Sequence, residues 1–156
     1  MPKRDYYNAP DGPPANSIVV AVAAFVQDNA GRVLMIRRTD NDQYAIPGGA
    51  QDIGETVAQA AIRETAEETG IDIEIAGLIG VYSDPGHVIA YDDGEVRQEL
   101  SLCFRARPIS GTPRTSSESI EVHWVDPADI APLNIGQANR LRIEHGLQQR
   151  AEPYIG

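Results

Sequence analysis

Residues 49–71, GAQDIGETVAQAAIRETAEETGI, constrain the fold of this chain more than any other stretch. Thr56 and Gln59 have the spacing of a capping box, in which two side chains bind the first free backbone N–H groups of a helix. Gly70 stands where a helix commonly ends, because glycine adopts a left-handed conformation without steric cost. The Ala- and Glu-rich residues between these signals include no Gly or Pro. The stretch therefore predicts a helix over about residues 57–69.

This helix places several carboxylates on one face. Glu64, Glu67 and Glu68 stand at i, i+3 and i+4, so their side chains are neighbours on the helix surface. Crowded like charges repel each other, and a cation among them removes the repulsion. Hard divalent cations such as Mg²⁺ prefer oxygen ligands and often bind carboxylates together with substrate phosphates. The face predicts a divalent-metal site, and the alternative is an ordinary solvated glutamate face.

The spacing of the whole stretch favours the metal site. Gly49 is followed by Glu55, then by Arg63-Glu64, by Glu67-Glu68 and by Gly70-Ile71. With ordinary residue usage, chance gives such a match about once in 10⁹ start positions. The pattern resembles the Nudix box, the signature of hydrolases that cleave a nucleoside diphosphate linked to another group.

The resemblance implies a role for each acidic residue of the box. Glu67 and Glu68 would be the main metal ligands, and Glu64 would be a further ligand or the general base. The backbone carbonyl of Gly49 would complete the metal shell. In the family, a metal-activated water attacks a phosphorus atom of the diphosphate, and the metal neutralises the oxygens that gain charge. The resemblance thus implies Mg²⁺ or Mn²⁺ as the cofactor.

Other residues of the box have structural roles in this interpretation. Arg63 and Glu55 would form an ion pair that holds the loop to the helix, and the alternative is an ordinary surface pair. Gly70 would end the helix. Thr65 departs from the family pattern, which usually has an aliphatic residue there, and its hydroxyl can bond to a carbonyl one turn earlier.

A late acidic residue often completes such a site. Glu118 precedes the strand that contains Trp124 and looks like the late glutamate that binds metal in the nucleotide-sanitising branch of the family. A solvated loop glutamate is the alternative. Glu99 is the second candidate, because it lies in a strand that can cross near the site. His87 is a weaker candidate for a loop base.

The substrate is less constrained by the sequence. Pro85 nearly fits the proline after the box that is associated with ADP-ribose cleavage, although turn geometry alone also explains a proline there. Nothing matches the coenzyme A or NADH signatures of the family, and nucleoside triphosphates and NDP-sugars stay open. Residues that could stack on a base or contact phosphate are Tyr44, Tyr82, Tyr91 and Arg97. A nucleotide-binding regulatory module without catalysis is the alternative function, but such modules usually lose box carboxylates that this chain retains.

Apolar patterns predict the remaining elements. Strands are expected at 17–26, 32–38, 71–83, 88–91, 96–106 and 122–125, and a second helix at 137–148. Residues 109–119 are predicted to form a loop. Gly77 and Gly80 suggest bulges, and Pro127 suggests the start of a short helix. Together with the resemblance, which covers about residues 17–145, this order predicts an α/β/α sandwich with a mixed sheet.

Length and composition bound the class of protein. The chain has 156 residues and 42% hydrophobic residues, which fits one domain, expected over 17–150, with tails at 1–16 and 151–156. Its net charge of -10 disfavours nucleic acid as a partner, whereas metal ions can reverse the local sign for a small anionic substrate.

Location and assembly are predicted only broadly. The sequence contains no long apolar run and no secretory signal, so neither a membrane association nor secretion is expected. The single cysteine, Cys103, has apolar neighbours and is expected in the core. These features predict a cytoplasmic location. The resemblance implies an enzyme with a small nucleotide as its substrate, and a monomer or homodimer is expected.

Overall fold

The central strand of the fold is the apolar run predicted after Asn16. In the computed structural model, which describes residues 3–156, this strand is β2 (Ser17–Val26). It pairs in parallel with β8 (Val96–Gly111) and antiparallel with β5 (Gly48–Ala50). A central strand that is covered on both faces reads as a nearly continuous apolar run, which is the pattern of β2.

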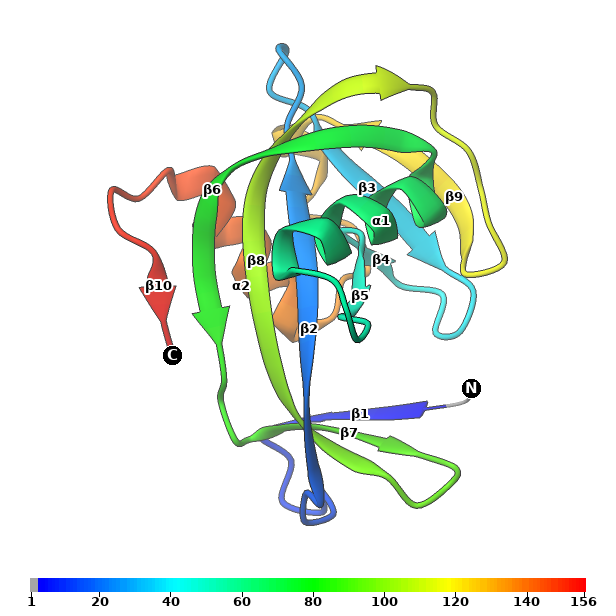
Figure 1. The fold of residues 1–156 in the computed structure, drawn as a ribbon, viewed down its shortest axis with the longest axis vertical. Helices are drawn as coiled ribbons and strands as arrows, with labels where there is room; N and C mark the ends of the chain where they lie inside the picture. Colours follow the sequence, from blue (N-terminus) through cyan, green and yellow to red (C-terminus); the bar gives the residue numbers. More distant parts are fainter. Residues whose placement is uncertain (1–2) are drawn as a thin grey trace.

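The larger sheet has seven strands and mixed directions (Figure 1). Its strand order is β1-β7-β8-β2-β5, while β6 pairs with the other half of β8 and β10 pairs with β6. Parallel pairs are β2 with β8 and β6 with β10, and the others are antiparallel. The strands not yet described are β1 (Lys3–Tyr7), β6 (Ile71–Tyr82), β7 (His87–Tyr91) and β10 (Tyr154–Ile155).

A smaller antiparallel sheet has the order β4-β3-β9. Its strands are β3 (Val33–Arg38), β4 (Tyr44–Ala45) and β9 (Ser119–Val125). Because β3 pairs with β9 along most of its length, this sheet carries the start of β9 to the end of β3. That arrangement places the loop before β9 near residues 38 and 39.

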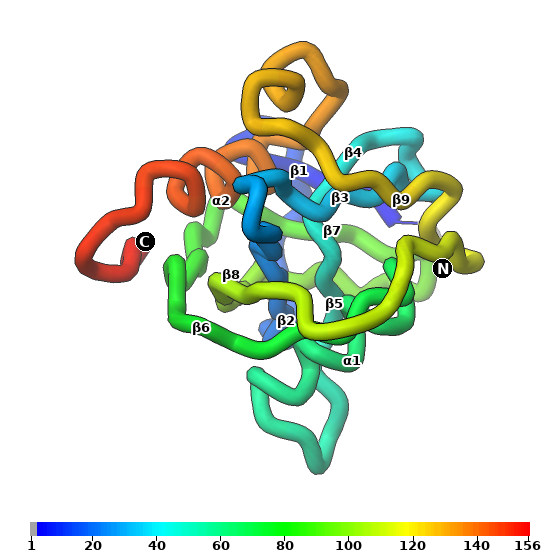
Figure 2. The backbone as a smooth tube through the Cα atoms, turned by 90° about the horizontal axis from the view of Figure 1, so that it is seen from above, coloured from blue at the N-terminus to red at the C-terminus, as the bar shows by residue number. Residues whose placement is uncertain are grey.

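Two helices cover opposite sides of the larger sheet. They are α1 (Val57–Thr69) and α2 (Gln137–Gln148), and a short 3₁₀ helix, η1 (Pro127–Asp129), precedes α2. Figure 1 shows α1 in front of β2 and α2 behind it, and the view from above in Figure 2 also places β2 between them. The predicted α/β/α architecture with a mixed sheet is confirmed.

The side chains of β2 alternate between the two helices, as strand geometry requires. Val22 packs in a cluster with Ala60 and Ala61 of α1, whereas Phe25 packs in a cluster with Ile143 of α2. Phe25 is fully buried. Burial of apolar surface on both faces stabilises the sheet and holds α1 in a fixed position above β5.

Most predicted elements are confirmed, with small changes at their ends. α1 and α2 have the predicted bounds, η1 begins at Pro127, and β6 is irregular around Gly77 and Gly80. Cys103 is buried.

Three predicted non-strand segments contain strands. The segment 109–119 was predicted to be a loop, but β8 continues to Gly111 and β9 begins at Ser119. The terminal segments 1–16 and 151–156 were predicted to be tails, yet they contribute β1 and β10. Main-chain pairing, which does not require an apolar pattern, stabilises these segments: β1 pairs with β7, β10 and the end of β8 pair with β6, and the start of β9 pairs with β3.

None of the helices formed by residues 3–156 is long and apolar enough to cross a membrane.

Candidate active site

The ends of α1 are set by the predicted side chains. The Thr56 hydroxyl accepts a hydrogen bond from the Gln59 N–H at 3.1 Å, and the Thr56 N–H donates to the Gln59 side chain at 2.9 Å. Gly70 has φ +77° at the other end, and its N–H donates to the Ala66 carbonyl. Thr65 is fully buried and donates to the Ala61 carbonyl at 2.7 Å, as predicted for this departure from the pattern.

Three carboxylates meet beside α1. Glu64 and Glu68 come from the helix and Glu118 comes from the loop before β9, and one oxygen from each lies within 4.8 Å of the others. Ligand oxygens bound to Mg²⁺ or Ca²⁺ lie about 2.0–2.6 Å from the ion, so ligands on opposite sides are up to about 5 Å apart. Donor type and spacing therefore fit a hard divalent cation.

Burial makes this cluster unfavourable for negative charge alone. Glu68 has only 2% of its surface exposed, and one of its carboxylate oxygens accepts a hydrogen bond from the Gly48 N–H at 3.2 Å. Burial, reinforced by the nearby Glu64, raises the pKa of Glu68 to about 8. Burial also raises the pKa of Glu64, although its contact with Arg63 opposes the shift. A positive ion at this place would stabilise both carboxylates.

The loop that carries Glu118 is attached to α1 and β3. The Ser119 hydroxyl donates to the backbone carbonyl of Glu68 at 2.6 Å, and the Arg114 N–H donates to the Thr69 carbonyl at 2.7 Å. The Thr39 N–H donates to the Glu118 carbonyl at 3.1 Å. These bonds hold Glu118 beside the helix and next to the other two carboxylates.

Gly49 lies against the Glu64 side chain. A Cβ atom built on Gly49 would lie 2.5 Å from the Glu64 carboxyl carbon, so a side chain at this position would displace the Glu64 carboxylate. The absence of a side chain therefore lets β5 approach the carboxylates. Gly49 therefore lies beside one of the three clustered carboxylates.

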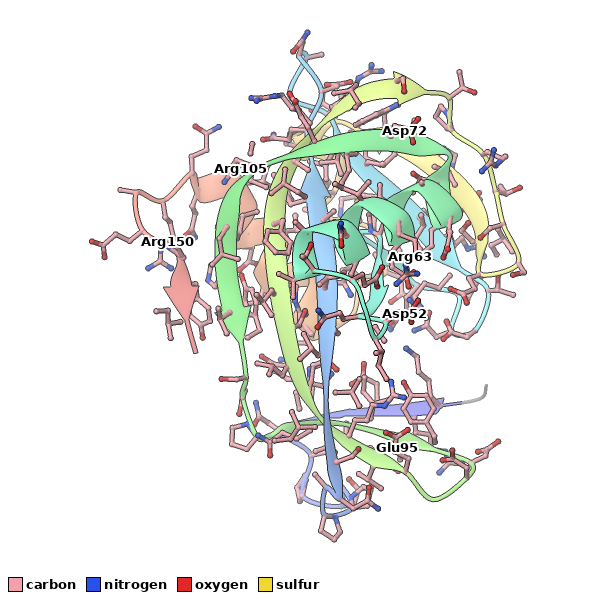
Figure 3. The ribbon with its side chains drawn as sticks, viewed as in Figure 1. Asp52, Arg63, Asp72, Glu95, Arg105 and Arg150 are labelled. Carbon is pink, nitrogen blue, oxygen red and sulfur yellow. The ribbon has the colours of Figure 1, made fainter. Side chains whose placement is uncertain are left out.

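Arg63 connects the loop before α1 to the carboxylate face (Figure 3). Its guanidinium donates to Glu55 at 2.6 and 2.9 Å, to the Ala50 carbonyl at 3.1 Å and to Glu64 at 2.9 Å. The Arg63 contact lowers the pKa of Glu55 to about 2, and the Glu55 contact raises the pKa of Arg63. The predicted Arg63–Glu55 pair is present, and it orients Glu64 as well as the loop.

Glu67 lies apart from the three clustered carboxylates. Its side chain is 60% exposed and accepts one hydrogen bond from Arg63 at 3.3 Å. The predicted role of Glu67 as a main metal ligand is therefore not matched by a position within the cluster of Glu64, Glu68 and Glu118.

A cleft with three adjoining hollows borders the cluster. The metal-side hollow, about 400 Å³, has Gly49, Glu64 and Glu118 in its wall. The inner hollow, about 160 Å³, and the outer hollow, about 370 Å³, extend toward α2. Lys3 and Arg38 border all three hollows.

The residues suggested for substrate binding lie at different places around the cleft. Arg97 borders the metal-side and inner hollows, and its guanidinium lies 4.5 Å from the Tyr91 ring centroid. Glu99 borders the inner hollow and lies outside the carboxylate cluster. Tyr44 borders the outer hollow and donates to Glu121 at 2.9 Å.

Tyr82 is positioned mainly by packing. Its side chain is buried, its hydroxyl shares a hydrogen bond with His145 Nδ1 at 2.8 Å, and its ring stacks on Tyr154. The Arg142 guanidinium also lies over the Tyr82 ring, 4.7 Å from its centroid. His87, the weaker candidate for a base, is buried, and its Nε2 lies 2.6 Å from Asp5.

Sequence reasoning missed three basic residues of the cleft: Lys3, Arg38 and Arg142. Arg38 ends β3, where a basic residue is unremarkable in a sequence. Lys3 was assigned to a tail, and Arg142 lies in a helix whose periodicity does not reveal which face meets the cleft. No local pattern distinguishes these residues, because only the tertiary structure brings them together.

The arrangement brings opposite charges to the two sides of one cleft. Carboxylates that fit a divalent cation lie on the α1 side, while Arg38, Arg97 and Lys3 border the same metal-side hollow. A diphosphate could then contact a metal ion and positive side chains at once, which is how phosphate-transfer sites stabilise developing charge.

Comparison with known proteins agrees with this arrangement. Residues 18–145 match the family model of the NUDIX domain. The chain is 39% identical over 119 residues to a MutT-like protein of Streptomyces ambofaciens, covering 76% of this chain and 70% of that protein. It is 40% identical over 122 residues to an ADP-ribose pyrophosphatase of Methanocaldococcus jannaschii, covering 73% of this chain and 65% of that protein.

Solved structures show the same fold. An ADP-ribose pyrophosphatase from Streptococcus suis superposes with a TM-score of 0.70 at 17% identity, covering 90% of this chain and 100% of that one. A MutT NUDIX hydrolase from Burkholderia pseudomallei superposes with a TM-score of 0.68 at 28% identity, covering 83% of this chain and 98% of that one. The family match spans the box, the cluster, α1 and most of α2, and the chain therefore belongs to the NUDIX family of hydrolases, which act on nucleoside diphosphates linked to another group.

Proposed function

We propose that this chain is a Mg²⁺- or Mn²⁺-dependent pyrophosphohydrolase of small nucleotides. The observation that carries the proposal is the meeting of Glu64, Glu68 and Glu118 beside a hollow bordered by positive side chains. Carboxylates in this number and spacing suit hard divalent cations. A bound divalent ion would lower the pKa of the attacking water and neutralise charge on the phosphate oxygens.

The residues of this chain have distinct parts in the proposal. Glu64, Glu68 and Glu118 hold the cation, with the Gly49 carbonyl as a further ligand. Arg63 keeps Glu64 oriented through its 2.9 Å contact while it is anchored by Glu55. Glu64 is proposed as ligand or base, since its carboxylate borders the metal-side hollow. Glu67 stays a predicted ligand, and its exposed position suits a second ion bound with substrate.

On the substrate side, the positive residues orient the diphosphate. Arg97 has donors left in the guanidinium fork after binding Glu95 at 2.9 Å. Arg38 is held by two 2.9 Å bonds to Asp40 and borders the same hollow. Charge-assisted hydrogen bonds of this kind are shorter and stronger than neutral ones.

ADP-ribose is the first substrate we propose, with nucleoside triphosphates and NDP-sugars as the next. The names of the relatives from Methanocaldococcus jannaschii and Streptococcus suis support this order. The position of Pro85 in the loop before β7 also agrees with it. A cytoplasmic location and a monomeric or homodimeric state stay predictions, as does the absence of nucleic acid and membrane partners.

The test is turnover of a substrate panel with and without a divalent metal. Phosphate-ester product is measured for ADP-ribose, NTPs, NDP-sugars and dinucleoside polyphosphates in Mg²⁺, in Mn²⁺ and in EDTA. We expect hydrolysis of at least one substrate with metal and a loss of at least 10²-fold in EDTA, on the scale of a major electrostatic contribution. Full turnover in EDTA would contradict metal dependence. Metal-dependent binding without turnover would favour the regulatory module instead.

A further inference from the structure

Strand β1 is held at the edge of the cleft by its pairing with β7. All five of its residues, Lys3–Tyr7, pair with β7, and the next residue, Asn8, donates its N–H to the Gly86 carbonyl at 2.8 Å. A side-chain contact adds to the ladder, since Asp5 lies 2.6 Å from the buried His87. Figures 1 and 2 both place the N-terminal end of β1 on the side of the loop that leads into β9.

Alternation along β1 directs one set of side chains into the cleft. Lys3, Asp5 and Tyr7 all border the outer hollow, whereas Arg4 is exposed and borders none of the hollows. This is the two-residue period of a strand. The register with β7 therefore decides that Lys3, rather than Arg4, is the cleft residue.

Lys3 lies where the three hollows adjoin. It borders the metal-side hollow together with Glu64 and Glu118, and it borders the inner and outer hollows as well. Arg38 is the other residue common to all three, but its guanidinium is bound by two 2.9 Å hydrogen bonds to Asp40. Lys3 is thus the more available of the two positive groups.

Lys3 is half-buried, and its ammonium has no ion-pair partner among residues 3–156. Burial lowers its pKa, the positive charge of Arg38 lowers it further, and Asp40, Asp5 and Glu99 oppose that shift. Removing a charged amine from water without pairing it is unfavourable, so its position calls for an anion supplied by a ligand.

The inner hollow has the opposite sign to the whole chain. In its wall two acidic residues, Asp5 and Glu99, face four basic ones. The whole chain has 23 acidic and 13 basic residues and a net charge of -10. Walls of one sign concentrate the electric field inside a cleft and favour entry of the opposite charge. The basic residues are Lys3, Arg38, Arg97 and Arg142.

We propose that β1 completes the substrate cleft and that its Lys3 binds a diphosphate oxygen of the substrate directly. β1 lies before residues 18–145, which match the family model. The proposal rests on the proposed function for the identity of the anion. It predicts that substrate affinity depends on a segment that looks like a tail in the sequence.

Three full-length variants test this contact: Lys3→Met, Lys3→Arg and the matched control Arg4→Met. Lys3→Met removes the charge but keeps a similar length, and we expect kcat/KM to fall at least tenfold, mainly through KM. Lys3→Arg keeps a phosphate donor and should recover most of the loss. Arg4→Met removes the same charge from the exposed face of β1 and should stay within about twofold of the natural chain.

Binding of inorganic pyrophosphate in Mg²⁺, measured by calorimetry, separates the two proposals. If the natural chain hydrolyses no substrate but Lys3→Met alone weakens pyrophosphate binding, the contact is supported and the proposed function is wrong. If the natural chain is active and Lys3→Met matches Arg4→Met in KM and in pyrophosphate affinity, the Lys3 contact is overturned. Equal losses in all three variants with a lowered Tm would also overturn it, because they would show a structural role for β1.

Discussion

Glu68 and Glu67 are neighbours in the sequence, yet their side chains lie in different environments. Glu68 is buried, accepts a backbone hydrogen bond from Gly48 and meets Glu64 and Glu118. Glu67 is mostly exposed and contacts Arg63. A helix turns by about 100° per residue, so adjacent residues cannot share one direction. The value of each carboxylate to a metal site is therefore decided by the side of α1 that faces β5.

A first prediction at this scale compares Glu118 with Glu99. Glu118 lies in the carboxylate cluster, so Glu118→Gln should lower kcat at least tenfold and change KM less, because its contact acts mainly in the transition state. Glu99 lies in the wall of the inner hollow, so Glu99→Gln should change KM rather than kcat. Steady-state kinetics of both variants in Mg²⁺ checks this. A large kcat loss in Glu99→Gln with normal Glu118→Gln would assign the late acidic role to Glu99.

At the scale of elements, the contact between β5 and α1 brings the site together. The N–H of Gly48 binds Glu68, and Gly49 lies against Glu64. On the other side, a Cβ atom on Gly48 would lie 2.3 Å from the Val22 carbonyl oxygen of β2. β5 is thus held between a backbone that cannot give way and a flexible carboxylate.

Alanine at each glycine should separate stability from activity. Gly48→Ala forces β5 away from the β2 backbone, so we expect a lowered Tm, with a loss of about 1–3 kcal/mol of stability for overpacking. Gly49→Ala meets only the end of the Glu64 side chain, so the fold should persist while kcat falls at least tenfold. Thermal melts and steady-state rates of the two variants check this. A Gly49→Ala variant with normal kcat would show that Glu64 can move without loss of function.

At the scale of the whole molecule, the fold places scarce positive charge at one cleft. The chain carries a net charge of -10, but basic residues from β1, β3, β8 and α2 border the inner hollow. Elsewhere the arginines hold the fold together, and Arg63 is the clearest example, with bonds to the loop and the helix. Positive residues such as Arg63 therefore stabilise the fold, whereas a different set borders the cleft.

The Arg63–Glu55 contact should make the stability of the chain sensitive to acid. The pKa of Glu55 falls from 4.5 to about 2 on folding, so the folded state favours its charged form. Its contribution is complete above pH 4.5 and is lost as the pH falls toward 2. Urea unfolding should therefore show the natural chain more stable than Glu55→Gln at pH 6, with the difference shrinking at pH 3 and below. A difference independent of pH would contradict this ionic contribution.

The sequence by itself determined the local structure of the site. The box specified α1 through its caps and carboxylate spacing, and it specified the Arg63–Glu55 pair. It also indicated the family, because fixed spacings on one helix leave few alternative chemistries. The late glutamate, Glu118, could be proposed from the order of elements but not placed, since its distance from Glu68 depends on pairing between β3 and β9.

Only the tertiary structure decided which basic residues lie in the cleft beside the carboxylates. Lys3 and Arg142 are far apart in the sequence and belong to segments without a distinctive pattern, yet both border the inner hollow. Backbone pairing of β1 with β7 places the first of them, and packing of α2 behind β2 places the second. Hydrogen bonds between main chains carry no signature in side-chain patterns. For that reason the sequence could not show that the segment that looks like a tail forms a wall of the cleft.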